Sequence, residues 1–107
     1  MKSLSASLRE REIIQMIKQV VIKMRKELKG RKVILFGSRA QGTAQERSDF
    51  DIGIVGSKPL PYEVFFKIQD QLEDIPTLFT IQLVDFSRAG ELFKKEALQS
   101  ALTLLKL

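Results

Sequence analysis

Cysteine, histidine and tryptophan are absent from this chain. Without cysteine and histidine, the chain cannot form disulfide bonds, zinc sites built from thiolates or imidazoles, or a Ser-His-Asp triad. No apolar run reaches transmembrane length, and the N-terminus lacks the apolar stretch of a signal peptide, so we expect a cytoplasmic protein without a membrane contact. Any catalysis must therefore rest on carboxylates, hydroxyls, amines and a bound metal ion.

The composition is that of an ordinary globular protein, and we expect one domain over residues 1–107. The formal net charge of +5 is concentrated in residues 1–32, which hold ten Lys/Arg and three Asp/Glu. This excess indicates either an anionic partner or a solvated helix face. Interleaved aromatic residues and a recognition motif are missing from this basic segment, so we do not expect nucleic-acid binding.

Hydrophobic periodicity predicts a small α/β fold, a mixed sheet of about three strands flanked by helices. A capping box that begins at Ser7 starts the first helix at Leu8, and Gly30 ends it. The predicted strands are Val33–Phe36, Phe50–Val55 and Leu78–Phe86. The other predicted helices are a short turn over Arg39–Gln41, a helix from Pro61 through Glu73 and a last helix over Glu91–Lys106.

A glycine-serine turn follows the first predicted strand. Gly37 and Ser38 are small, so the backbone at this point can approach a ligand closely, and its N–H groups can bind a triphosphate. Arg39 or Arg47 could screen the phosphate charge, or either could face water. The turn is therefore a candidate nucleotide-binding segment that includes Gly37, Ser38 and Arg39.

Two carboxylates begin the second predicted strand. Strand side chains alternate, so Asp49 and Asp51 share one face, whereas the core receives Phe50, Ile52 and Ile54. Two neighbouring acids repel each other and do not help folding, so we expect a cation between them. Gly53 either leaves room for a nucleotide or accommodates a sheet edge, and the sequence leaves both interpretations open.

A third acid, Asp85, lies in an otherwise apolar strand. It can meet Asp49 and Asp51 if the second and third strands are antiparallel neighbours, because parallel neighbours would separate the acids by a strand length of ~17–20 Å. Clustered carboxylates without histidine or cysteine are typical of Mg²⁺-dependent phosphoryl or nucleotidyl transfer. Alternatively, Asp85 is a strand-end residue that precedes a helix cap.

The segment GSRAQGTAQERSDFDIGI resembles the nucleotidyltransferase signature of the DNA polymerase beta superfamily, in which Gly-Ser, ten intervening residues and Asp-x-Asp follow one another. The small size and the GSRAxG opening resemble the minimal nucleotidyltransferases, although Gln41 stands where relatives often have a basic residue. The resemblance implies transfer of a nucleoside monophosphate, with Gly37 and Ser38 on the triphosphate. It also implies that Asp49, Asp51 and Asp85 are the catalytic, Mg²⁺-binding residues.

The resemblance further implies a partner and a cofactor. Minimal nucleotidyltransferases are often encoded beside a helical HEPN protein and act as antitoxins, some by transferring AMP to a tyrosine of that partner. We therefore expect two Mg²⁺ ions, ATP or another NTP as substrate, and a hydroxyl acceptor on a HEPN-type protein. The alternative is a non-catalytic nucleotide-binding subunit that neutralises its partner by forming a complex.

The last predicted helix carries more apolar residues than one buried face needs. Its surplus indicates contact with a partner chain or with a second copy, that is, a homo-oligomer formed through the C-terminal helix. The alternative is a helix packed into the core of its own chain.

Overall fold

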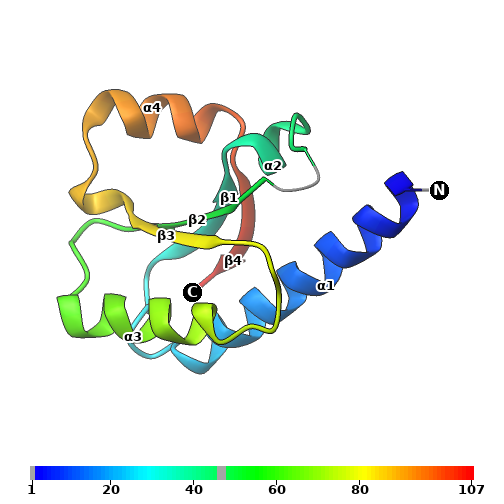
Figure 1. The fold of residues 1–107 in the computed structure, drawn as a ribbon. Helices are drawn as coiled ribbons and strands as arrows, with labels where there is room; N and C mark the ends of the chain where they lie inside the picture. Colours follow the sequence, from blue (N-terminus) through cyan, green and yellow to red (C-terminus); the bar gives the residue numbers. More distant parts are fainter. Residues whose placement is uncertain (1, 46–47) are drawn as a thin grey trace.

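The computed structural model describes residues 2–45 and 48–107 and contains a four-stranded sheet with helices on both faces (Figure 1). None of the helices within those ranges has the length and apolar character needed to cross a bilayer. The predicted mixed α/β class is confirmed, with one strand more than expected. The elements are α1 (Lys2–Lys23), β1 (Lys32–Phe36), α2 (Ser38–Gln41), β2 (Phe50–Val55), α3 (Tyr62–Glu73), β3 (Ile81–Asp85), the short 3₁₀ helix η1 (Phe86–Arg88), α4 (Glu91–Gln99) and β4 (Leu102–Lys106).

The strand order in the sheet is β3-β2-β1-β4. β1 is antiparallel to both β2 and β4, whereas β2 and β3 are parallel. The antiparallel pairing of the second and third strands, which the predicted meeting of the three acids required, is therefore absent. The physical reason is the connection between the two strands. α3 forms a crossover that returns the chain to the end of the sheet at which β2 begins, so β3 runs in the same direction as β2.

The C-terminal segment differs from its prediction as well. The predicted helix over residues 91–106 ends at Gln99, and Leu102–Lys106 forms β4 on the free edge of β1. A short apolar run of this kind fits a strand as well as a helix, and pairing with β1 satisfies its backbone hydrogen bonds. Of the apolar residues in this segment, Leu92, Phe93 and Leu98 of α4 and Leu102 of β4 remain exposed.

The larger core lies between the sheet and the layer formed by α1 and α3 (Figure 1). The stripe predicted for the first helix is buried at Ile13, Ile17, Val21, Met24 and Leu28, although α1 begins at Lys2 and is followed from Met24 by turns. From β2, the core receives Phe50, Ile52 and Ile54, as predicted. The alternate residues of β2 therefore face the opposite side of the sheet, where the candidate site lies.

On that opposite side, η1 and α4 cover a smaller core built around Phe86. The ring of Phe86 contacts Phe36 edge-to-face, with centroids 5.1 Å apart. A Cβ atom at position 53 would lie 2.5 Å from Cε1 of Phe86. Gly53 is small because this ring packs onto the strand, so neither of the two interpretations left open by the sequence accounts for it.

Candidate active site

The turn between β1 and α2 depends on Gly37. Its backbone has φ 77° and ψ −158°, a region populated almost only by glycine. The carbonyl of Gly37 accepts hydrogen bonds from the N–H groups of Ala40 and Gln41, at 3.1 Å each. A Cβ atom at position 37 would overlap with Oδ2 of Asp51. The turn and one of the predicted carboxylates therefore lie in direct contact.

Asp51 lies in β2 between Phe36 of β1 and Gln82 of β3. Burial, and then the charge of Asp49, raises the pKa of the Asp51 carboxyl, which indicates that the two acids lie close together. Within residues 9–45 and 48–107, no ion pair to Asp49 or Asp51 is present. Two neighbouring carboxylates that form no ion pair with those residues fit a hard divalent cation such as Mg²⁺.

The guanidinium of Arg39 holds the loop that leads to Asp49. It donates to the carbonyl of Ser48 from Nε at 3.1 Å and from Nη2 at 2.7 Å, and its Nη1 pairs with Glu10 Oε2 at 2.7 Å. It also stacks on the ring of Phe50, 4.1 Å from the centroid. These contacts support a positioning role for Arg39 rather than the predicted phosphate contact. Arg47, the other predicted candidate, lies outside the described residues.

The structure does not bring Asp85 to the other two acids. Asp85 pairs with Ile54 at the far end of β2 and shares the sheet face of Ile81 and Leu83. Its Oδ2 accepts the N–H of Leu60 at 2.8 Å. The predicted convergence of Asp85 with Asp49 and Asp51 is therefore wrong, because the parallel register separates the acids by the length of the strand.

Asp85 instead anchors backbone around the end of β3. It is 7% exposed, and its Oδ1 accepts the N–H of Ser87 at 3.0 Å, so both carboxylate oxygens are in use. Arg88 lies 3.6 Å from Oδ2. These contacts support the alternative interpretation of Asp85 as a strand-end residue that caps the following turn.

An Asp85→Asn variant should lower the free energy of unfolding by about 1–3 kcal/mol, because an amide leaves one buried backbone N–H without its acceptor. Urea denaturation measures this change, with the exposed Asp70→Asn as a matched control expected within about 0.5 kcal/mol of wild type. Mn²⁺ binding should stay at the wild-type level. Loss of Mn²⁺ binding with unchanged stability would contradict this assignment and restore Asp85 as a metal ligand.

Gln82 occupies the place that was predicted for the third acid. It faces Asp51 in the strand register, and its Nε2 donates to Oδ2 of Asp49 at 3.2 Å. Accordingly, among the residues that the structure describes, no three or more His, Cys, Asp or Glu side chains form a metal-binding group. The sequence does indicate this position for Gln82. A helix that connects two neighbouring strands favours parallel pairing, and parallel pairing places the starts of both strands at the same end of the sheet.

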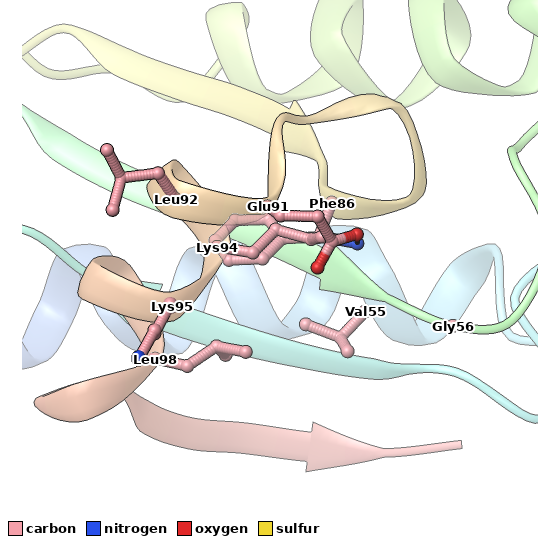
Figure 2. A pocket seen from close by; sticks show the side chains of 8 residues that line it. All are labelled: Val55, Gly56, Phe86, Glu91, Leu92, Lys94, Lys95 and Leu98. Atoms are coloured by element: carbon pink, nitrogen blue, oxygen red, sulfur yellow. Dashed lines mark ion pairs between the residues drawn. The ribbon is translucent and has the colours of Figure 1, made fainter.

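A separate hollow lies at the other end of β2, between the sheet and α4 (Figure 2). Glu91 and Lys94 on its wall form an ion pair at 2.9 Å. Val55 on its floor pairs with Lys32, whereas Asp51 pairs with Phe36, so the hollow and the carboxylates lie toward opposite ends of β2. Its lining consists of Val55, Gly56, Phe86, Glu91, Leu92, Lys94, Lys95 and Leu98.

The four-stranded sheet with its flanking helices is a nucleotidyltransferase fold. The family model described as Polymerase beta, Nucleotidyltransferase matches residues 13–106, and the chain belongs to this family. The resemblance to the minimal nucleotidyltransferases is confirmed, and the chain is a nucleotidyltransferase enzyme by family.

Known proteins similar to this chain include one from Methanocaldococcus jannaschii named "Putative protein adenylyltransferase MJ1215". The two are 38% identical over 63 residues, which cover 55% of this chain and 73% of the relative. A solved toxin-antitoxin with AMP-PNP has a TM-score of 0.64 at 23% identity, over 83% of this chain and 73% of that one. A solved complex of tri-AMPylated Shewanella oneidensis HEPN toxin with MNT antitoxin has a TM-score of 0.61 at 19% identity, over 88% of this chain and 73% of that one. At these identities, the two solved structures show a shared fold.

Proposed function

We propose that this chain transfers AMP from ATP to a hydroxyl group on a partner protein of the HEPN type. The observation that carries the proposal is the contact between the Gly37 turn and the Asp51 carboxylate, with Asp49 beside them. A triphosphate on the turn would then lie next to two carboxylates that lack a cationic partner from the described residues. The names of the adenylyltransferase relative and of the AMPylated toxin complex support AMP and a protein acceptor.

Each residue of this arrangement has a proposed role. The backbone at Gly37 and Ser38 binds the triphosphate, and Asp49 and Asp51 hold Mg²⁺ through carboxylate oxygens. When bound, the ion would supply Lewis acidity toward the phosphoryl oxygens and lower the pKa of the attacking hydroxyl. Arg39 keeps the loop before Asp49 in place through its bonds to Ser48. The number of ions stays a prediction.

The proposed reaction is a single displacement at the α-phosphorus. The acceptor oxygen forms a bond to this phosphorus, the bond from phosphorus to the oxygen that bridges to the β-phosphate breaks, and pyrophosphate leaves. The acceptor proton is released to solvent. The role of the chain is to hold the triphosphate in line with the acceptor and next to the carboxylates, which is how phosphoryl-transfer enzymes achieve most of their rate.

The test is co-purification of the chain with the product of the neighbouring gene, the proposed HEPN-type partner, followed by incubation with Mg²⁺ and ATP labelled at the α-phosphate. The partner should gain the label and the mass of one or more AMP groups, and EDTA should abolish the transfer. ATP labelled at the γ-phosphate should leave the partner unlabelled, which excludes kinase activity as the cause. A partner that gains no label from either substrate would contradict the proposed transfer.

The second candidate is a non-catalytic subunit that neutralises its partner by forming a complex. The observation that favours it is Gln82, whose neutral amide stands where a third carboxylate was expected. On this hypothesis, the two proteins form a stoichiometric complex without AMP transfer, and Asp49→Asn neutralises the partner as well as wild type does. The labelling experiment above distinguishes the two candidates.

A further inference from the structure

Gln82 is the side chain through which β3 reaches the two carboxylates. The strand register places it opposite Asp51, and its amide nitrogen lies 3.2 Å from Oδ2 of Asp49. Val84, the next residue on this face of β3, pairs with Gly53 and packs against the core around Phe86. The edge strand therefore contributes one polar group to this end of the sheet, and that group is an uncharged amide.

An amide and a carboxylate at this position have different consequences for a divalent cation. Both provide a hard oxygen ligand, but the carboxylate adds a full negative charge. The charge count of the ligands sets the affinity of oxygen-based cation sites over several orders of magnitude. With Gln82, the described side chains at this site carry the two charges of Asp49 and Asp51.

We propose that Gln82 is the third side chain of this site, and that its neutral amide keeps the affinity for a free divalent cation low, so that the ion enters together with the nucleotide phosphates. The hydrogen bond to Asp49 makes Gln82 a positioning residue in the absence of nucleotide. This inference rests on the proposed function, because it takes Asp49 and Asp51 as the cation ligands.

The test is Mn²⁺ binding measured by electron paramagnetic resonance, with and without ATP, on the purified chain. Wild type should bind Mn²⁺ weakly alone and at least about tenfold more tightly when ATP is present, counting only the Mn²⁺ held beyond that bound by the same ATP without protein. Gln82→Glu preserves the length of the side chain and Gln82→Asp places the charge closer to the strand. At least one of them should bind free Mn²⁺ about tenfold more tightly than wild type, since a further charge is added at short range.

Two variants separate the added charge from structural effects. Gln71→Glu makes the same chemical change on α3, which packs on the other face of the sheet, and should leave Mn²⁺ binding unchanged. Gln82→Ala removes the bond to Asp49 without adding charge, and should bind free Mn²⁺ no better than wild type. Gln82 is exposed, so its variants should fold, and their melting temperatures verify this directly.

The outcomes separate this inference from the proposed function. Suppose that wild type binds Mn²⁺ with ATP and that Asp51→Asn abolishes this binding. If neither Gln82→Glu nor Gln82→Asp then tightens the binding of free Mn²⁺, the role of Gln82 is overturned while the proposed function stands. If Gln71→Glu tightens the binding of free Mn²⁺ as much as the Gln82 variants do, the effect is one of added charge anywhere on the chain, and the inference is overturned. If wild type binds no Mn²⁺ even with ATP, both are overturned.

Discussion

An Asp51→Asn variant should transfer AMP to the partner about a thousandfold more slowly than wild type, or not at all. The amide removes the negative charge that would hold a divalent cation beside the Gly37 turn, and such a cation contributes several kcal/mol to the transition state, about a factor of ten for each 1.4 kcal/mol. The measurement is the initial rate at which the partner acquires labelled AMP, at saturating ATP and Mg²⁺.

The Asp51→Asn variant should lose activity without losing stability. The Asp51 carboxylate is partly buried beside Asp49, which is an unfavourable setting for its charge, so the neutral amide should not lower the free energy of unfolding. Asp70→Asn removes the same charge from the exposed surface of α3 and should retain the wild-type rate. Equal transfer rates in wild type and Asp51→Asn would refute the assignment of Asp51 to the metal site.

A Gly37→Ala variant should lose both stability and transfer. The glycine-only backbone conformation costs a residue with a Cβ atom about 1–3 kcal/mol, and the added atom overlaps with the Asp51 carboxylate. The carboxylate or the turn must move, and a displacement of about 1 Å in a catalytic site can reduce the rate about a hundredfold. Urea denaturation and the labelling rate measure the two effects.

Gly30→Ala is the matched control for this substitution. Gly30 also has a positive φ, 83°, but a Cβ atom there would meet no other atom within 4 Å. It precedes β1 at the end of the sheet away from Asp51, because Lys32 pairs with Val55. This variant should lose about 1–2 kcal/mol from backbone strain and keep the wild-type rate per folded molecule. If both alanine variants lose transfer equally, the contact between position 37 and Asp51 is not what the reaction requires.

Local sequence patterns predicted the elements that depend on neighbouring residues. Alternation identified Phe50, Ile52 and Ile54 as core residues and placed Asp49 and Asp51 together on the other face, because strand side chains alternate whatever the strand pairs with. The C-terminal run Leu102–Lys106 was mistaken for helix, since a short apolar segment has no period of its own and pairing with β1 decided its conformation.

The turn at Gly37 and the acids Asp49 and Asp51 could be predicted from the sequence alone. They are close in sequence, because one short segment connects the strand before the turn to the strand that follows the acids. The third position of the site depended on the direction of a strand that lies beyond a crossover helix. Parallel pairing of β2 and β3 moved Asp85 to the far end and put Gln82 beside the acids. Strand direction is set by how α3 packs back onto the sheet, which the strand-helix-strand order of the chain indicates but which no residue near Asp85 specifies.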